Sequence, residues 1–370
     1  MNHFTECDFQ HMQHALSLAA RGSHSTWPNP RVGCVIAHGA QVVGEGWHRS
    51  AGGPHAEVFA LRQAGALAKG ATAYVTLEPC SHVGRTGACH QALIDSGIAT
   101  VVVAHEDPFE KVNGRGIALL REAGIEVKVG LFRTAARELN RGFLSSVERQ
   151  RPWVQLKLGM SLDGRTALSN GRSQWISSHQ ARSDVQLWRA ASAAIVTGSG
   201  TVLADDPLLT VRHLSSPAAL PPVRVVLDSK ARVPGNARVF NSLAPSLHVI
   251  GLDASLDPST TTGNEVLRLQ SDENGVDLAQ LMHVLSERGL HDVFVEAGPT
   301  LAGALLKAGL VDELLVYIAP RLLGDIARPM VHLPELTSLH DSLNFSLYEV
   351  TSIGPDLRLR LRPDQNDTVR

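Results

Sequence analysis

Residues 72–104 have the sequence TAYVTLEPCSHVGRTGACHQALIDSGIATVVVA. The apolar runs at its two ends, Thr72–Leu77 and Thr100–Ala104, predict strands. Between them, residues 88–97 predict a helix. Strand and helix in alternation are typical of a layered α/β sheet, so this stretch indicates the fold class of the first half of the chain.

The same alternation continues on both sides of this stretch. Thr5 and Asp8 have the spacing of a capping box, and apolar residues follow them at helical intervals. Further helices are predicted over residues 55–65, 114–123 and 133–148, and further strands over residues 32–36, 41–43 and 126–130. A charged stretch, Glu148–Arg151, then precedes Pro152. We place a domain boundary there, so that residues 1–149 form one predicted domain and residues 150–370 the other.

The second half repeats the α/β pattern from Trp153 onward. Its predicted strands are Trp153–Leu158, Ala194–Thr197, Arg224–Leu227, Leu247–Gly251, Asp292–Glu296 and Glu313–Ile318. Its predicted helices cover residues 178–191, 277–288 and 299–308. Two domains agree with a length of 370 residues, because a single domain usually spans about 100–200 residues.

Composition indicates an ordinary globular protein in a reducing compartment. Hydrophobic residues make up 44% of the chain and charged residues 19%. The net charge of −2 argues against a broad basic surface for nucleic acid. No apolar run is long enough to cross a membrane, and the N-terminus (MNHFTECDFQ) lacks the features of a signal peptide. Four cysteines are too few for a disulfide framework, so we expect a cytoplasmic protein with reduced thiols.

Four residues of the first half have the composition of a catalytic zinc site. Zinc in such sites accepts imidazole and thiolate ligands and leaves one position for water. His55, Cys80 and Cys89 supply one imidazole and two thiols. The metal lowers the pKa of water to about 7, which makes hydroxide available at neutral pH. Glu57 follows the histidine closely and is the predicted catalytic proton carrier, as in zinc deaminases.

The spacing of the two cysteines departs from the common deaminase signature. That signature has two residues between the cysteines, whereas the insert SHVGRTGA separates Cys80 from Cys89. We expect this insert to face the substrate, because it begins at a metal ligand. A purely structural zinc with four protein ligands stays an alternative, since His82 or His90 could supply the fourth.

The second half contains three segments with glycine-rich turns near predicted strands. They are Lys157–Arg165, Thr197–Arg212 and Val295–Gly303. Two of them run from strand through turn to helix, a geometry that lets backbone N–H groups approach a phosphate. None has the G-x-G-x-x-G fingerprint, so spacing alone only favours a nucleotide cofactor over ordinary turns.

Together these motifs resemble one known family. They are Pro28–Gly33, His55–Val58 and Glu78–Thr86 in the first half, with Ser173–Ile176 and the three turn segments in the second. Both halves are similar to the bifunctional riboflavin-biosynthesis deaminase–reductases, over almost the whole chain. One departure is Gly87-Ala88, where the family often has two prolines. The resemblance implies an α/β fold with an N-terminal cytidine-deaminase-like three-layer α/β/α domain and a C-terminal dihydrofolate-reductase-like α/β domain.

The resemblance also implies the activity and its cofactors. The first domain would use one Zn²⁺ per chain to remove the 2-amino group of 2,5-diamino-6-(5-phosphoribosylamino)pyrimidin-4(3H)-one as ammonia. The second would use NADPH to reduce the ribosyl side chain to ribityl, with Lys157 and Asp205 as candidates for proton transfer. The family's NADPH contacts carry over to Gly159, Trp175, Thr201, Asp205, Ser229, Gly298, Pro299, Thr300, Leu301, Ala302, Gly303 and Ala304. Its substrate contacts carry over to Ser173, Arg189, Leu209, Arg212 and Glu296, and Asn29, His82 and Arg85 are further candidates in the first domain.

Two other functions are compatible with parts of the sequence. The chain could be a single-activity zinc deaminase of bases or nucleosides with an inactive C-terminal domain, although the near-neutral charge and the long insert count against a nucleic-acid base. It could also be a zinc-folded binding module, which Glu57 and the second set of motifs disfavour. For partners, we expect a small-molecule substrate, no nucleic acid, no membrane and a homo-oligomer.

Overall fold

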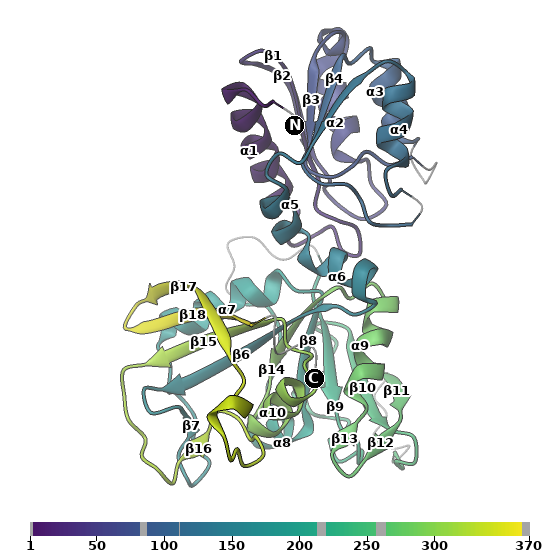
Figure 1. Cartoon of the computed structure of the whole chain (residues 1–370). Helices are drawn as coiled ribbons and strands as arrows, with labels where there is room; N and C mark the ends of the chain where they lie inside the picture. The colour runs from purple at the N-terminus through teal and green to yellow at the C-terminus, as the bar shows by residue number, and fades with distance from the viewer. Residues whose placement is uncertain (1–2, 82–86, 111, 213–219, 257–263, 365–370) are drawn as a thin grey trace. The chain divides into compact units, whose positions relative to one another are not determined.

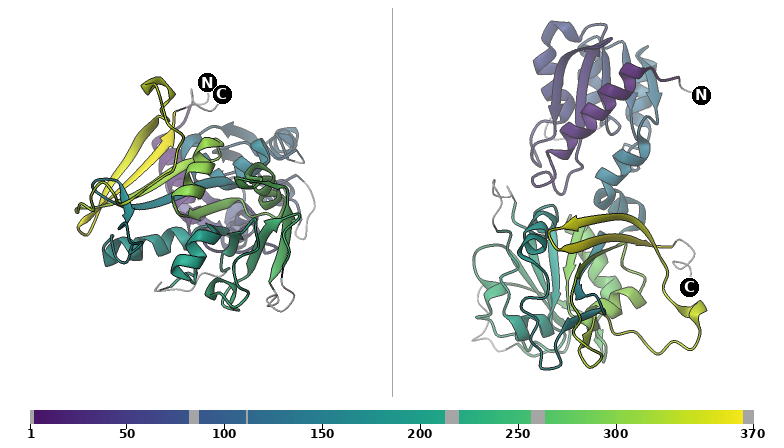
Figure 2. Two further views of the ribbon diagram at one scale, coloured as in Figure 1. Left: turned by 90° about the horizontal axis from the view of Figure 1, so that it is seen from below. Right: turned by 90° about the vertical axis from the view of Figure 1, so that its left-hand side faces the viewer.

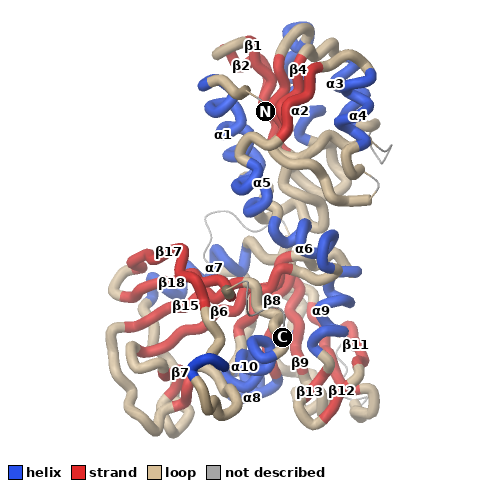
Figure 3. Tube along the Cα trace, viewed as in Figure 1, coloured by secondary structure: helices blue, strands red, loops and turns tan. Residues whose placement is uncertain are grey.

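The computed structural model of the chain describes residues 3–81, 87–110, 112–212, 220–256 and 264–364. The chain divides into two compact units, Met1–Gln150 and Arg151–Arg370, called here the first unit and the second unit (Figure 1). Each unit contains a large sheet of its own with helices packed against it (Figure 3). Among the described residues, no helix is both long and apolar enough to cross a membrane.

The first unit is built on a five-stranded sheet with the strand order β2-β1-β3-β4-β5. β1 runs antiparallel to β2 and β3, whereas β3, β4 and β5 are parallel to one another. The strands are β1 (Gly33–His38), β2 (Gln41–Trp47), β3 (Thr72–Val75), β4 (Thr100–Val103) and β5 (Glu126–Val129). The helices are α1 (Glu6–Ala20), α2 (Ala56–Ala64), α3 (Cys89–Asp95), α4 (Arg115–Glu122), α5 (Arg133–Leu139) and α6 (Arg141–Arg149).

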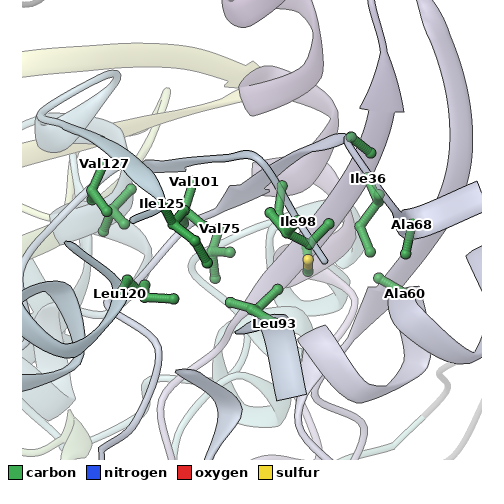
Figure 4. Close-up of a cluster of buried hydrophobic side chains, with 14 of the residues drawn as sticks. Ile36, Ala60, Ala68, Val75, Leu93, Ile98, Val101, Leu120, Ile125 and Val127 are labelled. Atoms are coloured by element: carbon green, nitrogen blue, oxygen red, sulfur yellow. The ribbon is translucent and has the colours of Figure 1, made fainter. Parts of the chain in front are cut away.

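Both faces of this sheet are buried, because successive side chains of a strand point to opposite faces. On β1, Cys34 and Ile36 pack with residues of α2, α3 and α4. Val35 and Ala37 pack with residues of α1 and α5 on the other face. Figure 4 shows the first of these clusters, with Leu93 of α3 among its apolar side chains. The first unit therefore has the predicted three-layer α/β/α fold.

Sequence signals predict the start of the first helix correctly, but they do not reveal an interruption within the last predicted helix of the first unit. The Thr5 side chain accepts a hydrogen bond from the backbone of Asp8 at the start of α1, and the reciprocal bond completes the capping box. Residues 133–148 are helical as predicted, except that the chain is interrupted at Asn140, so that α5 and α6 are two separate helices. The Asn140 side chain binds the backbone N–H and C=O of Arg31, at 2.7 and 2.9 Å. That partner is far away in sequence, so helical periodicity could not reveal the break.

The second unit is built on a nine-stranded sheet with the order β11-β10-β9-β8-β14-β6-β15-β18-β17. Strands from β11 to β15 in this order are parallel, and β18 and β17 run antiparallel at one edge (Figure 2). The strands of this sheet are β6 (Trp153–Ser161), β8 (Ala194–Gly198), β9 (Val223–Leu227), β10 (Ser246–Gly251), β11 (Glu265–Leu269), β14 (Asp292–Glu296), β15 (Glu313–Ala319), β17 (Phe345–Ile353) and β18 (Asp356–Pro363). Short pairs add β7 (Arg165–Ala167), β12 (Ser271–Asp272), β13 (Gly275–Val276) and β16 (Arg328–Pro329). The helices are α7 (His179–Ala190), α8 (Ser199–Asp205), α9 (Leu278–Glu287) and α10 (Pro299–Lys307).

All six strands predicted in the second half are present in this sheet, but the antiparallel hairpin β17–β18 was not predicted. Its turn contains Gly354, whose φ of +62° suits glycine. Its second strand alternates leucine with arginine, and Arg358 and Arg360 both pair with Glu349 across the hairpin. Such alternation is typical of a strand with two different faces, so the signal was present in the sequence.

Candidate active sites

The three predicted zinc ligands lie together in the first unit. His55 is the residue that precedes α2, Cys89 is the first residue of α3, and Cys80 lies in the loop after β3. Their ligand atoms all lie within 4.8 Å of one another. The Nδ1 atom of His55 is 3.2 Å from the Sγ of Cys89 and 3.6 Å from the Sγ of Cys80. One imidazole nitrogen and two sulfurs around one point are donors that zinc accepts, so these residues fit the metal.

The two thiols of this group differ in charge. Hydrogen bonds from Cys89 and His55 lower the pKa of Cys80 to about 4, so this sulfur is a thiolate at neutral pH. The contact with Cys80 and burial raise the pKa of Cys89. The pair thus carries one negative charge before any metal binds. A zinc ion would favour the second thiolate as well, because the thiolate is the form that binds metal.

Glu57 lies in the first turn of α2 and is almost fully buried, with 3% of its surface exposed. Burial and the nearby Cys80 raise the pKa of Glu57 to about 7. Its Oε2 atom has no hydrogen-bond partner among the residues that the structure describes. A carboxyl group with this pKa can both hold and release a proton near neutral pH, which is what a general acid and base requires.

Glu78 is a buried residue near the metal group whose role the sequence analysis did not assign. Its carboxylate accepts hydrogen bonds from the backbone N–H groups of Asp107, Gly114 and Ile117, at 3.1, 3.0 and 3.2 Å. The start of α4 also packs closely on the next residue, since a Cβ added at Gly116 would lie 2.0 Å from the carbonyl oxygen of Pro79. These contacts fix the backbone directly before Cys80.

Asn29 approaches the metal group through a second histidine. The Nδ2 atom of Asn29 donates to the Nε2 of His48 at 3.1 Å, and the Nδ1 of His48 donates to the carbonyl oxygen of Pro54 at 3.1 Å. The ring of His48 meets the ring of His55 edge to face, with 5.4 Å between their centroids. A predicted substrate contact thus lies near the metal group.

Two predictions concern the insert between Cys80 and Cys89 and a possible fourth zinc ligand, His82 or His90. His82 and Arg85, predicted as substrate contacts, lie outside the described residues. His90 is not part of the metal group, and its Nδ1 is 3.1 Å from the backbone carbonyl oxygen of Cys80. Within the described ranges, the group of possible metal ligands contains three residues, so His90 does not supply a fourth.

In the second unit, charged residues gather near the carboxyl ends of two neighbouring strands. Lys157 of β6 and Glu296 of β14 occupy paired positions. Arg189 of α7 binds the Glu296 carboxylate through two bonds, of 2.5 and 3.1 Å, and donates to the carbonyl oxygen of Thr210 at 2.9 Å. Burial lowers the pKa of Lys157. Although burial opposes it, the charge of Arg189 lowers the pKa of Glu296, so the carboxylate stays ionised.

The predicted cofactor contacts lie at the ends of four neighbouring strands. They follow the sheet order β9-β8-β14-β6, with Ser229 after β9, Thr201 after β8, Gly298 after β14 and Gly159 near the end of β6. Gly298 directly precedes α10 and provides no side-chain cap, so the backbone N–H groups that follow Pro299 in the first turn suit a phosphate. A Cβ added at Gly298 would lie 3.8 Å from the Oγ1 of Thr201, which places the two turns side by side. This arrangement fits a dinucleotide.

The remaining predicted cofactor contacts differ in exposure. Trp175 is 61% exposed, and the guanidinium of Arg182 stacks on its ring at 4.3 Å. Asp205, the last residue of α8, is exposed. Inside α10, Ala302 is fully buried and Gly303 packs on the backbone of His332. Thr300 is exposed, whereas Pro299 is buried and Leu301 and Ala304 are half-buried.

Two of the predicted substrate contacts lie on the segment that Arg189 binds. Leu209 is buried and has a φ of +49°, unusual for a residue other than glycine. The backbone N–H of Arg212 donates to the Oε1 of Gln186, also on α7, at 2.9 Å. This segment therefore lies beside the ion pair of Arg189 and Glu296. Ser173 is half-buried in the loop that precedes α7.

Comparison with known proteins matches both units. Residues 5–105 match the cytidine and deoxycytidylate deaminase zinc-binding region, and residues 152–359 match the RibD C-terminal domain. The riboflavin biosynthesis protein RibD of Escherichia coli (strain K12) is 50% identical over 364 residues, which cover 96% of this chain and 99% of the relative. The chain belongs to the RibD family. These matches do not support the two alternative functions considered above, a deaminase with an inactive second domain and a zinc-folded binding module.

Solved RibD structures have the same fold over nearly the whole chain. RibD of Acinetobacter baumannii (form 1) superposes with a TM-score of 0.90 at 44% identity, covering 97% of this chain and 99% of that one. A protein of Thermotoga maritima, named diaminohydroxyphosphoribosylaminopyrimidine deaminase/5-amino-6-(5-phosphoribosylamino)uracil reductase, superposes with a TM-score of 0.86 at 31% identity, covering 97% and 99%. The predicted fold class is confirmed. As a RibD family member, the chain is a bifunctional deaminase and reductase of riboflavin biosynthesis that uses zinc and NADPH.

Proposed function

We propose that the two units catalyse successive steps on one pyrimidine nucleotide. The first unit hydrolyses the 2-amino group of 2,5-diamino-6-(5-phosphoribosylamino)pyrimidin-4(3H)-one, releasing ammonia and leaving a carbonyl group. The second unit opens the ribosyl ring at the bond between C1′ and O4′, adds hydride from NADPH to C1′ and a proton to O4′, and so converts the ribosyl group to ribityl. The observation that carries the first step is the group of His55, Cys80 and Cys89 beside the buried Glu57. The name of the Thermotoga maritima relative supports the choice of substrate.

In the first unit, we assign the metal to His55 Nδ1, Cys80 Sγ and Cys89 Sγ, where Zn²⁺ supplies an activated water when it is bound. Glu57 accepts one proton from the attacking water and passes it to the ring nitrogen. It then accepts the second proton, from the hydroxyl group added to the ring carbon, and passes it to the amine, which departs as ammonia. The unpartnered Oε2 atom is the one we assign to this transfer. Asn29 orients the pyrimidine, and Arg85 and His82 of the insert are proposed contacts for the rest of the substrate.

In the second unit, the cofactor site contains the residues at the ends of the four neighbouring strands. NADPH supplies the hydride, and the protein orients the two reactants. We assign the cofactor to Gly159, Trp175, Thr201, Asp205, Ser229 and the turn from Gly298 to Ala304.

The substrate of the second unit then lies beside the ion pair of Arg189 and Glu296. Glu296 accepts from a pyrimidine N–H or a sugar hydroxyl, and Arg212, whose fork matches phosphate oxygens, binds the ribose phosphate. Ser173 and Leu209 complete this set. Of the two candidates for proton transfer, Lys157 is the better placed, because it is half-buried at the position paired with Glu296, whereas Asp205 is exposed.

We also propose that the chain forms a homo-oligomer, binds no nucleic acid and resides in the cytoplasm. The hairpin β17–β18 supports an oligomer, because Leu347, Val350 and Leu357 lie on one face of it and are 52%, 55% and 42% exposed. The net charge of −2 supports the absence of nucleic acid. Free thiols at all four cysteines agree with a reducing compartment. Light scattering at several protein concentrations measures the oligomeric state, and a monomer throughout would contradict that part of the proposal.

The test of the main proposal is incubation of the full chain with the diaminopyrimidinone ribotide and NADPH. We expect ammonia to appear first and NADPH to be oxidised in equal amount afterwards. Without NADPH, ammonia should still be released and the deaminated intermediate should accumulate. Oxidation of NADPH before any release of ammonia would contradict the proposed order, and release of ammonia from free nucleobases instead would contradict the substrate.

A further inference from the structure

The segment that carries Asn29 lies outside the helices and strands of the first unit. Residues 26–32 form only turns and loops, although Asn29 is the proposed contact for the pyrimidine. The segment is held at both ends, since the backbone N–H of Asn29 donates to the carbonyl oxygen of Thr26 at 2.8 Å. At the other end, the N–H of Gly33 donates to the Oγ1 of Thr76 at 3.1 Å. The position of Asn29 therefore depends on what fixes the residues between these ends.

Asn140 fixes the middle of this segment. Its Oδ1 atom accepts from the backbone N–H of Arg31 at 2.7 Å, and its Nδ2 donates to the carbonyl oxygen of the same residue at 2.9 Å. One side chain thus satisfies both backbone groups of Arg31, as a neighbouring strand does in a sheet. Asn140 is 5% exposed, so water has little access to its amide. These two bonds are called here the Asn140 clamp.

The side chain of Asn140 binds Arg31 instead of capping the helix that follows it. An asparagine directly before a helix commonly bonds to a backbone N–H of the first turn. Asn140 directly precedes α6, yet its side chain forms no cap bond with that helix. The interruption between α5 and α6 therefore brings the Asn140 amide to the segment of Asn29.

The segment is also bound by His48, on the side of the metal group. The Nδ2 of Asn29 donates to the Nε2 of His48 at 3.1 Å, and the backbone N–H of His48 donates to the carbonyl oxygen of Val32 at 2.9 Å. Arg31 lies between these two bonded residues, and the Asn140 clamp holds it. A shift of Arg31 would move Asn29 relative to His48 and hence to the metal group.

We propose that Asn140 is a positioning residue for deamination. By holding the backbone of Arg31, it sets the place at which the Asn29 amide meets the pyrimidine. Asn140 acts through Asn29 and is neither a contact of the substrate nor a ligand of the metal. This inference rests on the proposed role of Asn29 in the first unit.

The test is a double-mutant cycle of Asn140→Ala and Asn29→Ala in the full-length protein, with ammonia release from the diaminopyrimidinone ribotide as the readout. For Asn140→Ala, we expect kcat/KM to fall about tenfold to a hundredfold, because a misplacement of about 1 Å can cost about 10²-fold. Added to Asn29→Ala, the same substitution should cost about twofold at most. Zinc content and NADPH-dependent reduction of the deaminated nucleotide should not change.

Two further variants separate positioning from general stability. Asn140→Asp keeps the acceptor for the N–H of Arg31 and loses only the donor, so its loss of activity should be smaller than that of Asn140→Ala. Gln63→Ala is the matched control, because the exposed Gln63 of α2 also accepts a bond from a distant backbone N–H, that of Glu45 at 3.1 Å. This control should leave deamination unchanged.

Several results would overturn the inference. If Asn140→Ala leaves kcat/KM unchanged, or if its effect multiplies in full with that of Asn29→Ala, Asn140 does not act through Asn29. If zinc is lost along with the activity, Asn140 supports the metal group instead. If Asn29→Ala alone leaves deamination unchanged, the proposed role of Asn29 fails and the inference falls with it. A loss in Asn29→Ala without a loss in Asn140→Ala overturns the clamp alone, which separates the two failures.

Discussion

The backbone N–H of Cys89 donates a hydrogen bond to the Sγ of Cys80 at 3.3 Å. The insert SHVGRTGA lies between these two residues, so its two ends meet at the metal group. Because Cys89 also opens α3, the ligand geometry depends on the packing of that helix on the sheet.

Removal of the metal should separate the two activities. We expect Cys89→Ala, or dialysis of the native protein against a chelator, to abolish ammonia release, because a site with two protein ligands holds zinc poorly. Reduction of the deaminated pyrimidine by NADPH should continue, because its proposed site lies in the other unit. Metal analysis and the two separate assays check this, with Cys7→Ser as the cysteine control. Loss of both activities together would contradict independent sites.

Glu57→Gln should stop deamination without removing zinc. The amide has nearly the same size but cannot carry the proton, and loss of general acid–base catalysis costs about 10²–10⁴-fold in rate. Ammonia release and zinc content, measured on the same sample, check this expectation. If zinc disappears along with the activity, Glu57 supports the metal site instead of moving protons.

Glu78→Gln should weaken the first unit and its hold on zinc. The substitution replaces a carboxylate that accepts three backbone hydrogen bonds, and bonds to a charged group contribute about 1.5–3 kcal/mol each to stability. We expect a lower unfolding temperature and faster loss of zinc to a chelator. The exposed Glu122, at the end of α4, supplies the matched control Glu122→Gln. Equal stability of the two variants would mean that the bonds of Glu78 contribute little.

Arg212→Ala should weaken reduction and spare deamination. Its side chain is exposed, so the second unit should fold normally. We expect the KM of the deaminated nucleotide to rise about tenfold or more through loss of a charge-assisted phosphate contact. Steady-state kinetics with the phosphorylated and dephosphorylated substrates check this, since the variant should lose its preference between them. An unchanged KM would remove Arg212 from the phosphate site.

Much of the first unit could be predicted because its signals are local. Short apolar runs indicate β3 and β4, and the spacing of His55 and Glu57 indicates zinc chemistry before any contact is known. The break at Asn140 and the role of Glu78 could not be predicted in this way. Both depend on backbone groups that lie far away in sequence, such as that of Arg31.

In the second unit, the parallel strands were predictable from their apolar runs, but the order of the strands in the sheet was not. Nothing in the residues of β6 indicates that its partners are β14 and β15. The row of cofactor contacts becomes visible only with that strand order. The hairpin β17–β18 is different, because the alternation of leucine and arginine from Leu357 onward is itself a local signal of a strand.

The position of β6 has a consequence for how the chain folds during synthesis. Its partners β14 and β15 begin at Asp292 and Glu313, so they leave the ribosome long after β6 does. All strands of the first unit, by contrast, end at Val129 or earlier. Because distant pairings form late and domains fold as units, we expect the deaminase to reach its native state while the reductase sheet still lacks its central pairings. A nascent chain stalled after α9 would therefore bind zinc but not NADPH.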